Sequence, residues 1–187
     1  MSAILVVTGA SGAGKTAAVR ALAERGLPGV ECFHFDSIGV PSLEDMQRLH
    51  GGADLWQADA TDRWIKQLAG GPAEVTVLDG QTRPSFVHAA LARAGNPAAR
   101  VVLFDCAAEE RGRRLAGPRG QPELASSRMD AWAVYLRGQA DALGLPVLDT
   151  TAITIEAAAS MLEAEIQRLR RYATDSRSTP HPNREVP

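Results

Sequence analysis

The sequence predicts an α/β fold in which a parallel sheet of five strands is covered by helices on both faces. Five short apolar runs alternate with helical stretches along the chain, and this alternation is the pattern of a parallel sheet. The chain has 187 residues, a length that suits one domain with a core of that kind. We therefore expect a single domain over residues 1–173.

The first strand is expected at residues 3–8, because five consecutive apolar residues begin this segment, as in a buried strand. Four later runs have a similar length and are also rich in apolar residues. They place the other strands at residues 30–35, 75–78, 100–105 and 145–149.

Helices are expected between these strands, and turn residues mark several of their ends. Strong helix formers follow residue 15 and stop at Gly26. Pro84 suits the first position of a helix that ends at Gly95. The expected helices are residues 15–25, 43–49, 59–69, 84–94, 107–115, 122–143 and 154–171.

Composition narrows the range of functions. The net charge is −2, so no global basic field indicates binding to nucleic acid or to an anionic membrane. The N-terminus shows neither a signal-peptide pattern nor a run long enough to span a membrane. Cys32 and Cys106 are isolated, which fits neither a metal site nor a disulfide framework. We expect a cytoplasmic protein, a monomer or homodimer, with a disordered tail at residues 174–187, because that segment is polar and lacks periodicity.

The motif G-x-x-x-x-G-K-[ST] lies between the first expected strand and the first expected helix. The backbone N–H groups of such a loop, with those of the helix N-terminus, wrap a polyphosphate. The lysine reaches the β- and γ-phosphates, and the hydroxyl after it can bind Mg²⁺. A chance match to the whole motif is on the order of one in a hundred or less. The predicted nucleotide-binding residues are Gly9, Ala10, Ser11, Gly12, Ala13, Gly14, Lys15 and Thr16.

Acidic residues stand at the ends of three expected strands, on the edge where open α/β sheets bind ligands. Asp79 follows the third strand, and Asp105 ends the fourth. Because nucleotide sites of this type pair the loop hydroxyl with such a carboxylate, we predict that Thr16 and Asp79 hold Mg²⁺. The alternative for Asp79 is a carboxylate that caps a turn.

Asp36 follows the second strand and is a candidate catalytic residue. A carboxylate at that place could accept the proton of a substrate hydroxyl as the hydroxyl attacks the γ-phosphate. The alternative is an Asx-turn that leaves the strand. His34 alternates with Phe33 and Phe35, and we interpret it as a core or surface histidine rather than a catalyst.

Arginines gather in the segment from residue 111 to residue 128, across a helix, a Gly-rich loop and the next helix. Two of them are spaced i, i+3 and are therefore neighbours on one helix face. We predict a short lid over the triphosphate, in which these cations offset the charge of the transferred phosphoryl group. The predicted lid residues are Arg111 and Arg114 as nucleotide ligands and Arg119 and Arg128 as catalytic residues; Arg113 and Arg137 are interpreted as solvated.

Together these residues resemble the nucleoside and nucleotide kinase-like branch of P-loop proteins, over residues 3–150. The segment Asp79-Gly80-Gln81-Thr82-Arg83 is similar to the Asp-Gly-(Phe/Tyr)-Pro-Arg signature of adenylate kinase. The lid segment resembles its Arg-Leu pattern. The resemblance implies a sheet order of 2-3-1-4-5, Mg²⁺ and ATP as the phosphoryl donor, and Arg83 as a ligand for an anionic group on the acceptor.

The segment after the second strand departs from adenylate kinase, because it lacks the Thr-Gly-Asp that holds the acceptor nucleotide there. An Asp at this place is more similar to shikimate, gluconate and chloramphenicol kinases, where it faces an acceptor hydroxyl. The resemblance thus favours a kinase that phosphorylates a hydroxyl of a metabolite, nucleoside or antibiotic. A nucleoside monophosphate kinase and a non-kinase ATP-binding or ATPase regulatory protein stay open as alternatives.

The acceptor is expected to bind at an insert over residues 39–70. Trp56, Gln57 and Trp64 could line a pocket there, and Trp56 is our predicted acceptor contact beside Asp36 and Arg83. A hydrophobic patch that packs on the sheet explains these aromatic residues equally well.

Overall fold

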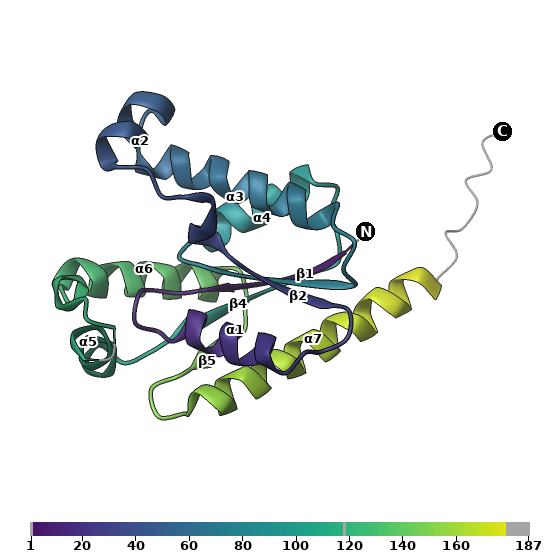
Figure 1. Ribbon diagram of the computed structural model, residues 1–187. Coiled ribbons are helices and arrows are strands. Elements are labelled where there is room, and N and C mark those ends of the chain that lie inside the picture. Colours follow the sequence, from purple (N-terminus) through teal and green to yellow (C-terminus); the bar gives the residue numbers. More distant parts are fainter. Residues whose placement is uncertain (1, 118, 179–187) are drawn as a thin grey trace.

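The computed structural model describes residues 2–117 and 119–178. It contains a parallel sheet of five strands in the order β2-β3-β1-β4-β5 (Figure 1). This order confirms the one that the resemblance implied. The strands are β1 (Ala3–Thr8), β2 (Val30–His34), β3 (Val75–Gly80), β4 (Ala99–Asp105) and β5 (Val147–Asp149).

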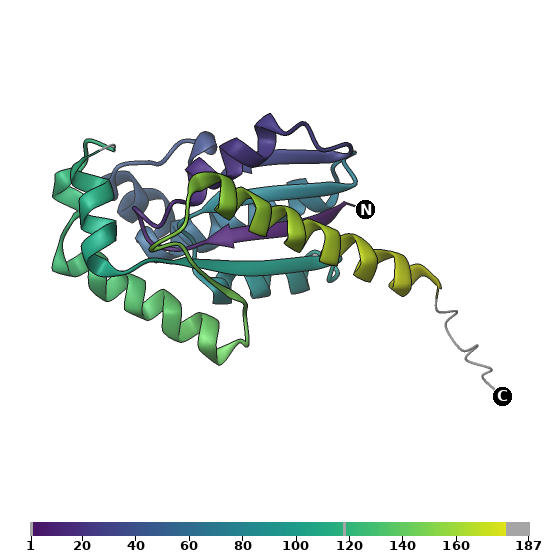
Figure 2. The ribbon, with the colours of Figure 1, turned by 90° about the horizontal axis from the view of Figure 1, so that it is seen from below.

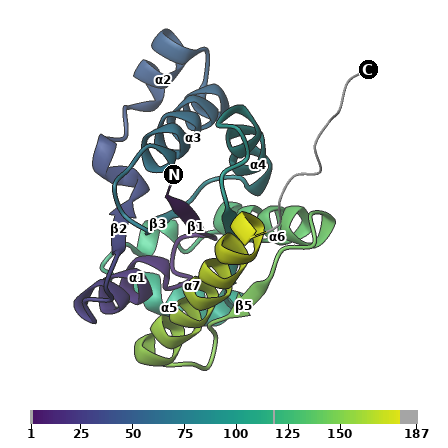
Figure 3. The same cartoon turned by 90° about the vertical axis from the view of Figure 1, so that its right-hand side faces the viewer.

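Helices cover both faces of the sheet, so the domain has three layers (Figures 1 and 3). One face packs against α1 (Lys15–Glu24) and α7 (Ile155–Ser178), and Figure 2 shows α7 running along the sheet. The opposite face packs against α3 (Ala53–Ala69), α4 (Pro84–Arg93) and α6 (Ser127–Ala142). The shorter helices are α2 (Leu43–His50), α5 (Ala108–Ala116), η1 (Phe35–Ile38) and η2 (Pro122–Leu124).

The central strand β1 joins the two halves of the core. Leu5 and Val7 face the layer of α1 and α7, whereas Ile4 and Val6 face the layer of α3 and α4. All four side chains are fully buried, as expected for a central strand of a parallel sheet that is covered on both faces. The loop that follows β1 therefore starts from a rigid strand.

Several elements differ in length from the sequence-based prediction. Strand β3 continues through Asp79 and Gly80, because Asp79 pairs with Val7 on β1 and with His34 on β2. Helix α3 begins at Ala53 and not at residue 59. Helix α6 begins only at Ser127, because the Ser126 hydroxyl caps it by accepting from the Met129 N–H at 3.4 Å.

Helix α7 continues to Ser178, well past the predicted end at residue 171. The first part of the predicted disordered tail at 174–187 is therefore helical, and residues 179–187 lie outside the described residues. Within the described ranges, the structure holds no helix that is both long enough and apolar enough to cross a membrane.

Candidate active site

The loop between β1 and α1 has the geometry that its glycines predict. Gly14 is the N-cap of α1 and adopts a left-handed conformation, with φ 88°. A Cβ on Gly9 would lie 2.2 Å from the carbonyl oxygen of Phe104, and one on Gly12 would lie 2.7 Å from Cγ of Arg111. These glycines are needed both for the backbone angles and for close packing on β4 and α5.

Lys15 lies in the first turn of α1 and is almost completely buried, with 7% of its surface exposed. Its Nζ donates a hydrogen bond to the carbonyl oxygen of Ala10 at 2.9 Å. Burial lowers the pKa of Lys15 to about 8. The carboxylates of Asp79 and Asp36 act in the opposite direction, and the Arg119 cation lowers this pKa further. The charged groups that the sequence singled out on three separate segments thus surround one ammonium group.

Thr16 and Asp79, the two residues that we predict to hold Mg²⁺, contact each other. The Thr16 hydroxyl donates to Oδ2 of Asp79 at 2.5 Å, and Asp79 is buried at the end of β3. The other oxygen, Oδ1, forms a hydrogen bond with Nδ1 of His34. The sequence analysis did not predict that His34 binds Asp79. The available signal was that His34 lies near the end of the second expected strand, at the same edge of the sheet as Asp79.

Asp36 lies on η1, directly after β2, and its side chain is exposed. The core anchors η1, because Phe35 is buried and its carbonyl oxygen accepts a hydrogen bond from Nε1 of Trp64 at 3.0 Å. The carbonyl oxygen of Asp36 accepts from the Gly39 N–H at 3.0 Å, which closes the turn. The structure thus holds Asp36 on a short helical turn, with its carboxylate close enough to Lys15 to raise that group's pKa.

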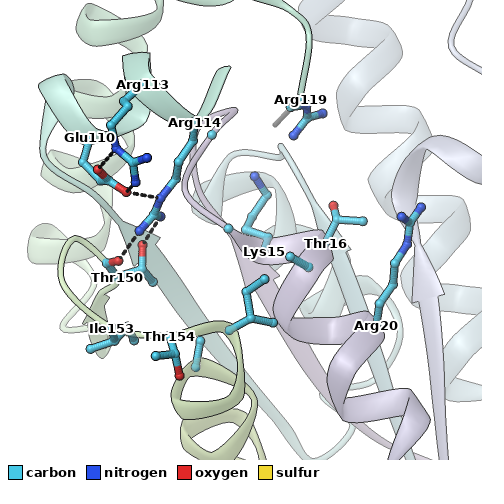
Figure 4. Close-up of a pocket in the computed structure, with 15 residues that line it drawn as sticks. Lys15, Thr16, Arg20, Glu110, Arg113, Arg114, Arg119, Thr150, Ile153 and Thr154 are labelled. Carbon is cyan, nitrogen blue, oxygen red and sulfur yellow. Dashed lines mark hydrogen bonds and ion pairs between the residues drawn. The ribbon is translucent and has the colours of Figure 1, made fainter. Parts of the chain in front are cut away.

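A pocket of about 690 Å³ opens beside the loop (Figure 4). Its wall combines the first turn of α1, the outer end of α5 and the segment after β5. Figure 4 shows the side chains of Lys15 and Arg119 directed into the same space. The described lining residues are Gly12, Gly14, Lys15, Thr16, Ala17, Arg20, Glu110, Arg113, Arg114, Arg119, Thr150, Ile153, Thr154, Ile155 and Ala158.

Arg114 is fixed at the wall of this pocket, which we call the nucleotide pocket after the predicted ligand of the loop. Its Nε donates to Glu110 at 2.7 Å, and its Nη2 donates to the carbonyl oxygen of Thr150 at 2.6 Å. The Thr150 hydroxyl in turn donates to the carbonyl oxygen of Ala13 in the loop at 2.9 Å. The arginine is therefore held in place by contacts within the protein itself.

The four predicted lid arginines lie in three different places. Arg114 and Arg119 line the nucleotide pocket. Arg111 is buried beneath the loop, where it donates to the carbonyl oxygen of Cys106 at 2.7 Å and pairs with Asp130 on α6. Arg128 lines a different pocket. Residue 118, inside the predicted lid, lies outside the described residues.

This second pocket has a volume of about 870 Å³ and lies between α2 and α3 on one side and η2 and α6 on the other. Arg83 and Trp56, which we predict to contact the acceptor, line it together with Gln57. Trp64 does not line it, because its ring is buried in the core below η1. Gln81 joins the two sites: it lines the second pocket, and its Oε1 accepts from the Ser11 hydroxyl of the loop at 2.9 Å.

Comparison with known proteins gives structural relatives only. No protein-family model matches the chain, and no curated protein sequence matches it. Many solved structures do match. A shikimate kinase from Acinetobacter baumannii in complex with shikimate is 16% identical, with a TM-score of 0.60, over 90% of this chain and 94% of that one. A gluconokinase from Sinorhizobium meliloti 1021 is 17% identical, with a TM-score of 0.60, over 96% and 98%.

The fold is that of P-loop small-molecule kinases. The tunicamycin resistance protein of Deinococcus radiodurans shares it, at 18% identity and a TM-score of 0.62, over 89% of this chain and 96% of that one. At these identities the likeness shows the kinase fold, and the functional assignment depends on the residues of this chain.

Proposed function

We propose that this chain is an ATP-dependent phosphotransferase that moves the γ-phosphoryl group of Mg-ATP to a hydroxyl group of a small molecule. One observation carries the proposal: Lys15, Thr16 and Arg119 line one pocket, the Thr16 hydroxyl donates to Asp79 at the end of β3, and Asp36 follows the neighbouring parallel strand β2 at the same edge of the sheet. A phosphate-binding lysine, a metal-binding carboxylate, a base and a lid cation are the parts that phosphoryl transfer requires.

The donor triphosphate fits the nucleotide pocket. The N-terminus of α1 offers its backbone N–H groups to the phosphates, and five cationic side chains among the described lining residues supply positive charge: Lys15, Arg20, Arg113, Arg114 and Arg119. In the structure, Nζ of Lys15 donates a hydrogen bond to the carbonyl oxygen of Ala10. We infer that it exchanges this carbonyl for phosphate oxygens, which are stronger acceptors because they are ionised.

The residues at Thr16 also fit Mg²⁺. The described residues hold no group of three or more His, Cys, Asp or Glu side chains that could bind a metal alone. Mg²⁺ in phosphate sites, however, takes one or two protein oxygens and completes its shell with phosphates and water. Thr16 Oγ1 and Asp79 Oδ2, at 2.5 Å from each other, would hold it. When bound, the ion would neutralise charge on the phosphates.

Asp36 is the proposed base. As the acceptor oxygen forms its bond to the γ-phosphorus, the acceptor O–H bond breaks and the proton passes to the Asp36 carboxylate. The bond from the γ-phosphorus to the bridging oxygen breaks at the same time, and ADP leaves with that electron pair. Arg119 would stabilise the charge on the transferred group from the lid side.

The variant Asp36→Asn tests this assignment, since it keeps the size of the side chain and removes the proton acceptor. Transfer to a hydroxyl should fall by about 10²–10⁴-fold, while the dissociation constant for Mg-ATP stays nearly unchanged. Asp59→Asn, an exposed carboxylate on α3, is the matched control. Rapid transfer to a nucleoside monophosphate that persists in Asp36→Asn would contradict the proposal, because a phosphate acceptor needs no base at neutral pH.

A further inference from the structure

The second pocket differs from the nucleotide pocket in charge. Among the described residues, five cations and a single carboxylate line the nucleotide pocket, as an anionic triphosphate requires. Two arginines and two carboxylates line the second pocket: Arg83, Arg128, Asp54 and Glu123. Its lining charge is therefore balanced, and an anion that entered it would approach two carboxylates as well as two cations.

Arg83 is a largely buried cation of this pocket, and its guanidinium already donates hydrogen bonds within the protein. Its Nη1 donates to Oε1 of Gln57 at 2.6 Å, and its Nη2 donates to Oδ1 of Asp54 at 2.6 Å. Only 13% of the Arg83 side chain is exposed. Asp54, whose side chain is 73% exposed, thus pairs with the cation that the family resemblance assigns to an anionic acceptor group, and an anion would compete with this carboxylate for Arg83.

Aromatic rings surround the same guanidinium. Its central carbon lies 4.8 Å from the ring centroid of Trp132 and 5.0 Å from that of Phe86. Trp132 also stacks on Tyr135, with ring centroids 5.3 Å apart. These contacts hold Arg83 as part of the wall, where its planar guanidinium group packs against the aromatic rings.

The rest of the wall is largely apolar and partly open to solvent. Leu43 is 70% exposed and Tyr135 is 44% exposed, although both line the pocket. Trp56 forms the inner wall and meets Phe35 edge to face, with centroids 6.2 Å apart. Because Phe35 precedes Asp36, this wall is directly joined to the proposed base. Grouped exposed apolar side chains around a pocket indicate a ligand with an apolar body.

Trp132 adds one polar feature to this wall. Its indole N–H is buried, and among the described residues none accepts a hydrogen bond from it. A buried donor without a partner is uncommon, and the Trp132 ring also packs against the core cluster of Leu103, Leu136 and Ala140, so this ring forms a fixed part of the wall.

We propose that the second pocket binds an uncharged hydroxyl compound with a flat aromatic or heteroaromatic ring, and that it discriminates against anionic acceptors. The ring would pack against Trp56, Trp132 and Tyr135. Asp36 is among the described lining residues of neither pocket, but it follows Phe35, whose ring meets Trp56, and the hydroxyl would point toward this side of the pocket. The identity of this ligand as a phosphoryl acceptor rests on the proposed function; its binding does not.

Direct binding tests the proposal without using activity. The wild-type chain is saturated with Mg²⁺ and the β,γ-imido analogue of ATP, so that the nucleotide pocket is filled. Calorimetry then compares matched pairs that differ in charge: uridine and adenosine against their 5′-monophosphates, and phenylglycol against mandelate. The uncharged member of at least one pair should bind at least about tenfold tighter than its anion, because the anion loses hydration at a wall of balanced charge and competes with Asp54 for Arg83.

Two variants probe the wall itself. Trp132→Leu should weaken binding of the preferred ring compound by about tenfold through loss of stacking, whereas Val134→Ala, exposed on the same helix, should not. Tyr135→Ser, at a more exposed ring, repeats the test if Trp132→Leu fails to fold. Asp54→Asn frees the Arg83 cation and should raise affinity for the anionic members, with Asp62→Asn as its control.

The outcomes separate this inference from the proposed function. Tighter binding of the anions, or binding of neither member in every pair, overturns the inference even if phosphoryl transfer to some acceptor is found. The expected preference without any phosphoryl transfer supports the inference about the pocket and contradicts the proposed function. A response of Val134→Ala equal to that of Trp132→Leu also overturns the assignment of the wall.

Discussion

Lys15 shows how far single residues could be predicted from the sequence. Its motif was sufficient to predict the loop and the helix that follows, because the spacing fixes the local backbone. The burial of Lys15 and the hydrogen bond of His34 to Asp79 were not predictable. They depend on which side chains three adjacent strands bring together, and local sequence does not specify that.

The lowered pKa of Lys15 gives a prediction at this scale. Below pH 8 the free protein holds the ammonium form, and above pH 8 most Lys15 loses its proton, since its pKa is about 8. Bound triphosphate favours the charged form, so ATP binding should take up about one proton at pH 9 and almost none at pH 7. Calorimetry in buffers of different ionisation enthalpy measures this uptake.

Two variants make the proton uptake specific. The chain has two lysines, and Lys66 is exposed on α3. Lys15→Met should abolish the proton uptake and weaken ATP binding, and Lys66→Met should change neither. Equal uptake in the wild-type chain and in Lys15→Met would show that another group titrates on binding.

At the scale of elements, the end of β3 and the short helix η1 must pack closely for the site to form. A Cβ on Gly80 would lie 2.4 Å from Cβ of Phe35, which is the residue before Asp36. The prediction placed the end of β3 two residues too early, since Asp and Gly are poor strand formers. Pairing with two neighbouring strands outweighs this preference, and it is not visible in local sequence.

Gly80→Ala should therefore damage stability and activity together. The added methyl group pushes against a buried ring, and we expect the free energy of unfolding to fall by about 1–3 kcal/mol. Gly138→Ala is the control, because a Cβ there meets nothing within 4 Å on α6. The control should raise the free energy of unfolding by roughly 0.5–1 kcal/mol. Denaturant unfolding of both variants measures the sign of the change in the free energy of unfolding. An unchanged free energy of unfolding in Gly80→Ala would refute the close packing of Gly80 on Phe35.

The lid segment carries its arginines to two different pockets, which revises what each should do. Arg119 lines the nucleotide pocket, so Arg119→Ala should lower kcat and kcat/KM together, by about 10²-fold. Arg128 lines the second pocket, so Arg128→Ala should act mainly on the KM of the acceptor. Steady-state kinetics with each substrate varied in turn distinguishes these effects. If Arg119→Ala raised only the KM for ATP, the assignment of Arg119 to the transfer step would be wrong.

At the scale of the whole molecule, two pockets of unlike charge meet at the carboxyl edge of one sheet. Alternating strands and helices were enough to predict the fold class, and the resemblance supplied the strand order. The second pocket could be anticipated only as a segment, over residues 39–70. Half of its wall comes from η2 and α6, and the balanced charge around Arg83 arises only when these distant segments pack together. The cytoplasmic location and the oligomeric state stay predictions.

The most direct test of the account is transfer of labelled phosphate. The chain is incubated with Mg²⁺ and ATP labelled in the γ-phosphoryl group, together with uncharged aromatic alcohols and nucleosides, and the label is followed by mass spectrometry. The account predicts ADP and a phosphorylated acceptor in equal amounts with the wild-type chain and with Lys66→Ala. It predicts neither product with Lys15→Ala, and a loss of about 10²–10⁴-fold with Asp36→Asn. Release of labelled inorganic phosphate at a rate that no acceptor changes would contradict the account.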